Sequence, residues 1–221
     1  MGEGEARARI AILLSGRGSN FLALHSAIER GEIPAEIALV LSNADGAAGL
    51  GRAGELGLPT ACVPHSDARD RAEHESRVLE ALSRARVEWV CLAGYMRLLS
   101  PSFVAAYRER MLNIHPSLLP AFPGLSVQAQ AIEHGVKISG CTVHLVDNGL
   151  DSGPIVIQRP VPVLDDDTPD ALSARILEQE HQAYPEALRR LLTEPWKVVG
   201  RRVVFGDGRR TPEVGHRTAS T

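Results

Sequence analysis

The chain has 221 residues, of which 44% are hydrophobic and 23% charged, and its formal net charge is −3. This composition argues against disorder and favours one sizeable folded core. The slightly acidic balance gives no electrostatic support for nucleic-acid binding. No apolar run reaches about 18 residues, so we expect no transmembrane helix, and the first residues lack the pattern of a signal peptide.

The cysteines and histidines form no pattern that is typical of a metal site. Cys62, Cys91 and Cys141 are widely spaced, and an odd number of separated cysteines is typical of reduced thiols in a cytoplasmic protein. Cys91 and Cys141 lie in apolar runs, where cysteine acts as a small buried side chain. The histidines include no pair at zinc-ligand spacing. We therefore expect a cytoplasmic protein without a bound metal.

The first half of the chain alternates between buried strands and amphipathic helices. Continuous apolar runs that end at turn residues indicate strands of a parallel sheet, and they occur at residues 9–14, 37–41, 60–63 and 89–93. Helical patterns separate them at residues 20–29, 46–56 and 70–86. In the first helix Asn20 is the expected cap, and one face carries Phe21, Leu24 and Ile28. This alternation predicts an α/β fold with a Rossmann-like, doubly wound, mostly parallel sheet.

The second half breaks this alternation. After a strand that ends near residue 115, two strand-like runs follow each other at 141–146 and 155–163. Successive strands of this kind predict antiparallel additions to the sheet in the C-terminal half. The remaining elements are a helix near 127–134, a long helix capped by Thr168 that reaches about Leu192, and a hairpin over 196–205 that turns at or just after Gly200.

No internal repeat or low-complexity linker divides the chain. We therefore interpret residues 1–221 as a single domain. Its core covers about residues 8–195. The polar residues from 206 onward are expected to form a flexible tail.

Asn113 and His115 are the first candidates for chemistry. They lie two residues apart at the end of a predicted strand, so their side chains point to the same side, and Pro116 stops the ladder just after them. An amide can hold a developing oxyanion while an imidazole moves protons, so the pair suits carbonyl chemistry. The same short pattern is also common in turns and caps, and alone it does not define a catalytic site.

A glycine-rich turn, residues 16–20, joins the first strand to the first helix. Glycines let the backbone approach a ligand, and a helix N-terminus offers free amides, so a phosphate is the expected guest. The third glycine of the dinucleotide fingerprint is missing, because Phe21 occupies its position. A plain tight turn is the alternative interpretation.

Three further segments admit both structural and functional readings. Residues 94–99 follow the fourth strand, and ligands of open α/β sheets lie beyond the carboxyl ends of the strands, so this segment and the Asn113 segment should share a cleft. Asp151 begins an Asp-Ser-Gly tripeptide, which usually forms an Asx turn. His144, on a predicted strand two residues from Thr142, is interpreted as a structural histidine.

Several motifs together resemble a known family. The string Asn-Ile-His-Pro-Ser-Leu-Leu-Pro at 113–120, followed by Phe-Pro-Gly at 122–124, resembles the signature of the formyltransferases that use 10-formyltetrahydrofolate. Residues 139–144 and 150–154 continue the resemblance, which covers roughly residues 8–195. It implies the formyltransferase fold. It also implies transfer of a formyl group from 10-formyltetrahydrofolate, as co-substrate, to the amine of glycinamide ribonucleotide in purine biosynthesis, without a metal.

The resemblance also implies roles for individual residues. Asn113 and His115 match catalytic positions. Asp151 matches the carboxylate that orients the histidine, and its negative charge would favour the protonated imidazole. The positions matching ribonucleotide contacts are Gly18, Ser19, Asn20, Glu178, Gln179 and Glu180. Those matching folate contacts are Arg71, Met96, Arg97, Leu98, Leu99, Asn113, Asp147, Asn148, Gly149, Leu150 and Asp151. Ser126 and Gln128 depart from the family pattern, which often has histidines there.

Alternative functions remain open. A formyltetrahydrofolate hydrolase, or a methionyl-tRNA or sugar formyltransferase, would share the same three central groups. We expect neither a preceding regulatory domain nor an added C-terminal domain, and the phosphate loop favours a small phosphorylated substrate. A non-catalytic folate- or nucleotide-binding module is the alternative from a different class, and the intact Asn113, His115 and Asp151 set argues against it. The sequence leaves open whether two copies form a homodimer.

Overall fold

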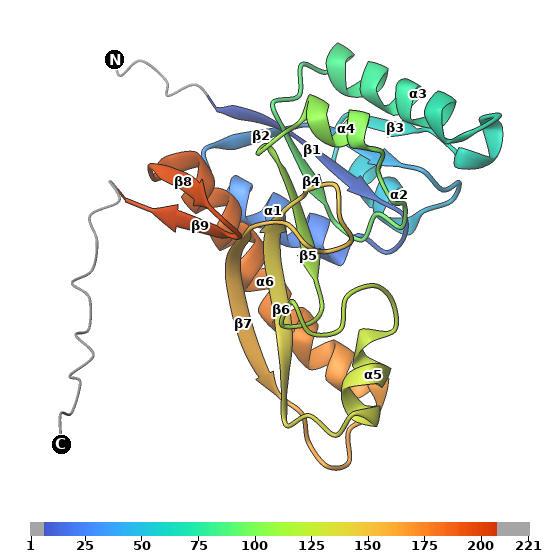
Figure 1. The fold of residues 1–221 in the computed structure, drawn as a ribbon. Coiled ribbons are helices and arrows are strands. Elements are labelled where there is room, and N and C mark those ends of the chain that lie inside the picture. Colours follow the sequence, from blue (N-terminus) through green and yellow to red (C-terminus); the bar gives the residue numbers. More distant parts are fainter. Residues whose placement is uncertain (1–6, 207–221) are drawn as a thin grey trace.

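The computed structural model describes residues 7–206 (Figure 1). The strands of this part of the chain are β1 Ala8–Leu14, β2 Ala35–Ser42, β3 Thr60–Cys62, β4 Trp89–Leu92, β5 Met111–His115, β6 Ile138–Leu145, β7 Ile155–Pro162, β8 Trp196–Val199 and β9 Arg202–Phe205. All of them belong to one nine-stranded sheet in the order β3-β2-β1-β4-β5-β6-β7-β9-β8.

The sheet is parallel in its first half and mainly antiparallel in its second. The pairs β1–β2, β1–β4, β2–β3 and β4–β5 are parallel, and β6 runs antiparallel between β5 and β7. This confirms the predicted fold class. The hairpin β8–β9 also forms where it was predicted, and it joins the main sheet through one parallel pair, Ile155 with Arg202. That attachment was not predicted, because a single long-range pair leaves no local pattern.

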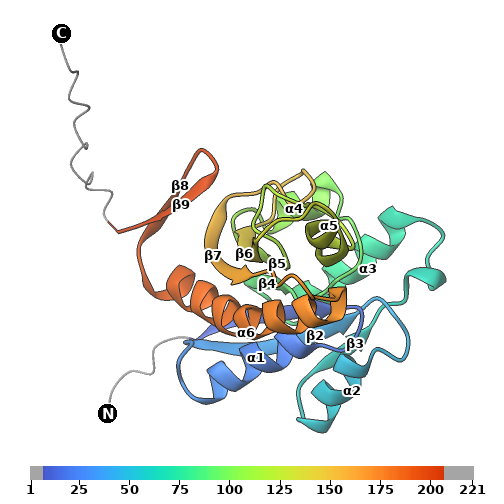
Figure 2. The ribbon, with the colours of Figure 1, turned by 90° about the horizontal axis from the view of Figure 1, so that it is seen from below.

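Helices cover both faces of the sheet, as in a doubly wound fold. Their bounds are α1 Ser19–Glu29, α2 Ala48–Glu55, α3 Arg71–Arg84, α4 Pro101–Ala106, α5 Val127–Glu133 and α6 Pro169–Thr193, with a short 3-10 turn η1 at His65–Asp67. Helices α1 and α6 lie side by side on one face, and α3 and α4 lie on the other (Figure 2).

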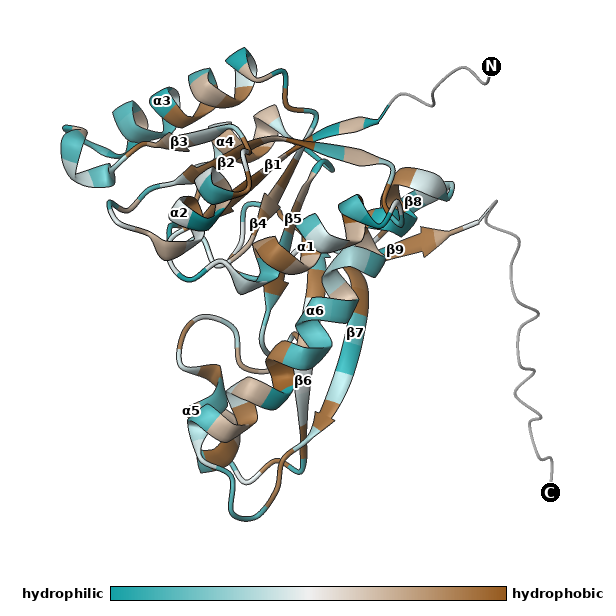
Figure 3. Ribbon diagram, turned by 180° about the vertical axis from the view of Figure 1, so that it is seen from behind, coloured by the Kyte–Doolittle hydropathy of each residue, from teal (hydrophilic) through white to brown (hydrophobic). Residues whose placement is uncertain are grey.

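Each face of the sheet has its own hydrophobic core. Neighbouring residues of a strand point to opposite faces, so Ile12 packs in the core under α1 and α6 while Leu13 packs in the core under α3 and α4. The central strands are accordingly mostly hydrophobic (Figure 3). Cys91 and Cys141 are fully buried in the first core, which confirms their reading as small buried side chains.

Two local features differ from the sequence prediction. Asn20 is not the cap of α1, because the helix begins one residue earlier with Gly18 at the cap position and no side-chain cap. The short helix α4 was not predicted, although Ser100 caps it by accepting from the Phe103 amide at 3.2 Å, and Pro101 occupies its favoured first position. The unusual brevity of α4 hides its periodicity.

Other predicted boundaries agree in part. Thr168 caps α6 by accepting from the Ala171 amide, as predicted. Strand β6 begins at Ile138, three residues before the predicted start. Among residues 7–206, no helix is long and apolar enough to cross a membrane. The predicted flexible tail lies outside the described residues, apart from Gly206.

Candidate active site

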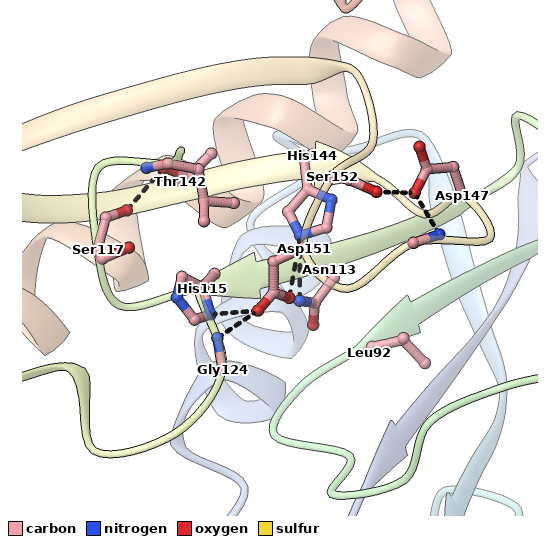
Figure 4. A network of polar contacts seen from close by, with 12 residues as sticks. Leu92, Asn113, His115, Ser117, Gly124, Thr142, His144, Asp147, Asp151 and Ser152 are labelled. Atoms are coloured by element: carbon pink, nitrogen blue, oxygen red, sulfur yellow. Dashed lines mark hydrogen bonds and ion pairs between the residues drawn. The ribbon is translucent and has the colours of Figure 1, made fainter. Parts of the chain in front are cut away.

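Strand β5 presents Asn113 and His115 on the same side at its carboxyl end. The antiparallel neighbour β6 places His144 opposite Asn113 and Thr142 opposite His115. The loop between β6 and β7 returns to this point and brings Asp151 beside both histidines (Figure 4). Residues that are far apart in the sequence therefore form one polar cluster in which His115 and His144 are almost fully buried.

Asp151 faces His115 across a short gap. Its Oδ2 lies 3.4 Å from His115 Nδ1 and accepts a hydrogen bond from the Gly124 amide at 2.9 Å. Its Oδ1 lies 3.8 Å from His144 Nε2. The backbone of Asp151 is left-handed, with φ 49°, a conformation that aspartate and asparagine tolerate better than most residues. The predicted Asx turn at Asp151 is not among the hydrogen bonds of the described residues, and the Asp151 carboxylate instead faces Gly124 and the two histidines.

The second nitrogen of His115 is also engaged. His115 Nε2 lies 2.8 Å from the carbonyl oxygen of Phe122, to which it donates. Both ring nitrogens thus face oxygen atoms, which hold the imidazole ring in one orientation. A substrate oxygen could meet Nε2 only by replacing the Phe122 carbonyl. The segment around Phe122 is consequently part of the site.

His144 fixes the amide of Asn113. The Leu145 carbonyl lies 2.9 Å from His144 Nδ1, which must donate to it, and this leaves Nε2 to accept from Asn113 Nδ2 at 3.2 Å. The second N–H of that amide has no hydrogen-bond partner among the described residues. His144 was interpreted as structural because its own strand shows only a Thr-x-His alternation. The role of His144 follows from the pairing of β5 with β6, which the sequence of β6 alone does not reveal.

Burial lowers the pKa of His144, and this effect exceeds the opposing effects of the Leu145 carbonyl and the Asp151 charge. The folded protein therefore holds a neutral His144, whereas the unfolded chain takes up a proton below about pH 6.5. This residue contributes stability that is present above that pH and is lost on acidification.

We expect His144→Gln to make the melting temperature fall less steeply than in the wild type as the pH drops from about 7 to about 5. Thermal melts across this range measure the slope, and His25→Gln on α1 is the matched control. Equal slopes in wild type and His144→Gln would exclude this contribution.

Ser117 and Thr142 hold the chain that leaves β5. Thr142 Oγ1 donates to the Ser117 carbonyl at 2.7 Å and accepts from the Leu119 amide at 3.0 Å. The Ser117 hydroxyl donates to the carbonyls of Ala121 and Phe122. Within residues 7–206 the Ser117 hydroxyl has no basic side chain as a partner, so these contacts position the segment and give no activated nucleophile.

The glycine-rich turn forms the N-terminus of α1, where the first amides of a helix have no partners in the helix. Gly18 has φ 75°, and a Cβ there would come within 2.8 Å of the Gly49 Cα in α2. The turn therefore requires glycine for its own conformation as well as for any ligand. Asn20 Nδ2 donates to Glu180 Oε2 at 2.7 Å, which joins the turn to α6. Burial raises the pKa of Glu180, and the Asn20 bond partly opposes this.

The other two residues of α6 that were predicted to contact the ribonucleotide, Glu178 and Gln179, have different surroundings. Glu178 is exposed and Gln179 is half-buried on α6. Neither has a side-chain hydrogen bond to residues 16–20 among the bonds of the described chain. Of the three neighbours on α6, Glu180 alone is joined to the turn.

The predicted folate residues fall into three places. Residues 96–99 follow β4, whose neighbours in the sheet are β1 and β5, and the Met96 and Leu98 side chains are 66% and 67% exposed. In the loop after β6, Asp147 accepts from the Ser152 hydroxyl at 2.6 Å and from the Gly149 amide at 3.1 Å. Arg71, on the first turn of α3, donates to Glu75 Oε1 at 2.9 Å.

Two hollows border these segments. One, of about 400 Å³, lies between α4, the loop after β6 and the β8–β9 turn, and its lining includes Val104, Val146, Asp147, Asn148 and Arg201. The other, of about 380 Å³, is lined by Arg71, Glu75, Leu79 and the serines 76, 100 and 102. Neither hollow is lined by Asn113, His115 or Asp151, so the polar cluster itself lies outside them. Residues 7–206 contain no group of three or more potential metal ligands.

An amide, an imidazole and a carboxylate lie together at the carboxyl end of an inner strand of a Rossmann-like sheet. This arrangement defines a site suited to carbonyl-group chemistry. Comparison with known proteins identifies the family. Residues 8–188 match the family model described as Formyl transferase. The chain belongs to this family.

Individual relatives agree with this assignment. The chain is 38% identical to phosphoribosylglycinamide formyltransferase of Escherichia coli (strain K12), with 94% of this chain and 97% of that protein covered. It is 48% identical to the trifunctional purine biosynthetic protein adenosine-3 of Drosophila melanogaster, over 85% of this chain. The match spans only 14% of the length of that longer relative.

Solved structures show the same fold. Glycinamide ribonucleotide transformylase 1 from Symbiobacterium toebii superposes with a TM-score of 0.89 and 44% identity, covering 93% of this chain and 100% of that one. Formyltetrahydrofolate deformylase from Burkholderia mallei ATCC 23344 superposes with a TM-score of 0.83 and 30% identity, covering 93% of this chain and 72% of that one. Proteins named as a transformylase and as a deformylase therefore share this fold.

Proposed function

We propose that the chain transfers the formyl group of 10-formyltetrahydrofolate to the amine of glycinamide ribonucleotide, giving formylglycinamide ribonucleotide and tetrahydrofolate. The observation that carries this proposal is the cluster of Asn113, His115 and Asp151 at the sheet edge. The cluster lies at the carboxyl end of β5, while the candidate phosphate turn follows β1 and the candidate folate segment follows β4. The name and nearly equal length of the Escherichia coli relative support the choice of substrates.

In the proposed reaction the ribonucleotide amine attacks the formyl carbon directly. A new carbon–nitrogen bond forms, the bond from that carbon to N10 of the folate breaks, and the formyl oxygen carries negative charge in between. The free N–H of Asn113 donates to this oxygen, because His144 holds the other N–H. No acyl-enzyme and no metal ion are needed.

His115 joins the reaction by exchanging its Phe122 partner for the developing oxyanion. Asp151 supports the protonated imidazole through the 3.4 Å contact at Nδ1. The attacking amine loses a proton and the leaving N10 gains one, so His115 and an ordered water would relay it. Movement of the Phe122 carbonyl is thus a step of the proposed reaction.

We assign the ribonucleotide phosphate to the N-terminus of α1. Unpartnered amides and the positive end of the helix dipole favour an anion there. Gly18, Ser19 and Asn20 supply these amides, and the Glu180 carboxylate beside Asn20 can accept from sugar hydroxyls. We include Glu178 and Gln179 as outer neighbours of this substrate.

Ser19→Asp tests the phosphate assignment. A carboxylate at this position would repel a phosphate, and like charges in contact cost several kcal/mol, so we expect the Kd for the ribonucleotide to rise by at least about tenfold. Ser19→Asn, which is of the same size but neutral, is the matched control. Calorimetric titrations measure both variants, and the Kd for tetrahydrofolate should change little. An unchanged ribonucleotide Kd in a folded Ser19→Asp protein would place the phosphate elsewhere.

We assign the folate to the side of the cluster formed by residues 96–99 and 147–151. The exposed apolar side chains of Met96 and Leu98 can form one wall, with Arg97 and Leu99 beside them. Asp147, Asn148, Gly149 and Leu150 form the facing loop. Arg71 borders a hollow together with three serines and Glu75, whose carboxylate already accepts from Arg71 Nε and the Ser100 hydroxyl. The remaining N–H groups of the Arg71 guanidinium can meet a carboxylate of the co-substrate.

The hydrolase is the second candidate, because a deformylase shares this fold at 30% identity. The two functions differ in whether an amine is the acceptor. Mass spectrometry of a reaction with purified protein, 10-formyltetrahydrofolate and glycinamide ribonucleotide is the direct experiment. Formylated ribonucleotide supports the proposal, whereas formate as the sole formyl product supports the hydrolase. The three free cysteines support a cytoplasmic setting for either.

A further inference from the structure

The side chain of Ser15 joins the two segments to which we assign different substrates. Ser15 is the first residue after β1, directly before the phosphate turn. Its hydroxyl accepts a hydrogen bond from the backbone amide of Met96 at 2.8 Å and donates one to Asn43 Oδ1. Met96 begins the candidate folate segment. One hydroxyl therefore contacts the two loops and a buried residue after β2.

The directions of these hydrogen bonds are fixed by chemistry. The Met96 N–H can only donate, so the single hydroxyl proton of Ser15 must go to the Asn43 oxygen. Asn43 is 3% exposed, and its carbonyl accepts from the His65 amide at 3.2 Å. The hydroxyl is consequently held in one orientation by a partner that cannot move easily.

Backbone contacts hold the two loops in register up to this residue. Ala93 donates to the Leu13 carbonyl at 2.8 Å, and Ser15 donates to the Gly94 carbonyl at 3.0 Å, which continues the β1–β4 ladder beyond both strands. On the other side of Ser15, the Gly49 amide donates to the Gly16 carbonyl at 2.9 Å. The phosphate turn is therefore fastened on both sides.

The folate segment is attached more weakly. In the described structure, the Met96 amide is the only backbone donor of residues 95–99 that has a hydrogen-bond partner. The Met96 and Leu98 side chains are largely exposed, so packing restrains them little, whereas Tyr95 and Leu99 pack against the core under α3 and α4. The Ser15 hydroxyl thus sets the position of the Met96 backbone between these two packed residues.

We infer that Ser15 is a positioning residue that couples the two substrate sites. A phosphate that orders the turn after Ser15 also favours the position of Met96 that binds the folate, and the folate favours the turn in the same way, because such coupling is reciprocal. This inference rests on the proposed function. It adds that each substrate binds more tightly when the other is present.

The test compares ribonucleotide binding with and without tetrahydrofolate, the product that has no formyl group to transfer. Calorimetry gives the Kd for glycinamide ribonucleotide in each case, and the ratio of the two values is the coupling factor. We expect a factor clearly above one in the wild type. Ser15→Ala removes both side-chain hydrogen bonds, each worth about two- to tenfold in an equilibrium, so its factor should fall to near one.

Two further variants separate coupling from simple destabilisation. Ser15→Thr keeps the hydroxyl and should restore the coupling factor, and Ser26→Ala, an exposed serine of α1, should leave it unchanged. If Ser15→Ala weakens both ligands equally and keeps the wild-type factor, its role is structural and the inference is wrong. A wild-type factor of one would also overturn it. A wild-type protein that binds neither ligand would contradict the proposed function itself.

Discussion

Asn113→Ala and His115→Ala should each lower kcat by at least about a hundredfold, since one well-placed oxyanion donor is typically worth that much. Both side chains act on the same oxygen in the proposed transition state. The double variant should therefore lose less than the product of the two single losses. Steady-state rates of formyl transfer for the four proteins of this cycle measure the effect.

Folding must be separated from chemistry in this experiment. Asn113→Ala leaves the buried His144 without a donor, and His115→Ala removes the bond to Phe122, so both variants should melt somewhat earlier. Ile114→Val on the same strand removes one buried methylene group, which costs about 0.5–1.5 kcal/mol, and provides a control of similar stability with normal kcat. Full additivity, or a His115→Ala enzyme near wild-type speed, would refute the shared role.

Asp151→Asn should lower kcat by roughly ten- to a hundredfold, because a hydrogen bond to a charged group is worth about 1.5–3 kcal/mol. Asparagine tolerates the left-handed backbone of this position and can still accept from the Gly124 amide. The substitution thus removes the charge beside His115 while it keeps the backbone conformation and the Gly124 contact. Substrate affinities should fall less than kcat, because the carboxylate acts mainly in the transition state.

If the role of Asp151 were purely structural, the rates and stabilities of its variants would differ from this expectation. Asp151→Asn would then have near-normal turnover, and only Asp151→Ala, which loses the Gly124 contact and strains the left-handed backbone, would lose stability. Thermal melts and kcat for both variants distinguish the two cases. Loss of rate in Asp151→Asn without loss of stability supports the catalytic role, and normal turnover contradicts it.

The sequence predicts the fold well where local periodicity carries the information. Buried runs and amphipathic helices locate β1, β2, β4 and the long α6, and the succession of two late strands gives the antiparallel half of the sheet. Helix α4 escapes because six residues are too few for a periodic signal. The hairpin's attachment to β7 escapes because it depends on one long-range pair.

The candidate site shows the same division. Asn113 and His115 are predictable as a pair, because the alternation of a strand sets their common side. The place of His144 depends on which strand lies next to β5, and the contact of Asn20 with Glu180 depends on how α1 meets α6. Sequence patterns contain neither fact. The hydrogen bonds of the Ser15 hydroxyl similarly depend on three loops that meet only in the folded protein.

The central claim is that the formyl group passes to an amine and not to water. Its most direct test follows 10-formyltetrahydrofolate labelled with ¹³C in the formyl group, with and without glycinamide ribonucleotide, by NMR. We predict that label enters formylglycinamide ribonucleotide in equal amount to the tetrahydrofolate released, and that release without the ribonucleotide is negligible. Labelled formate appearing at the same rate whether or not the amine is present would contradict it.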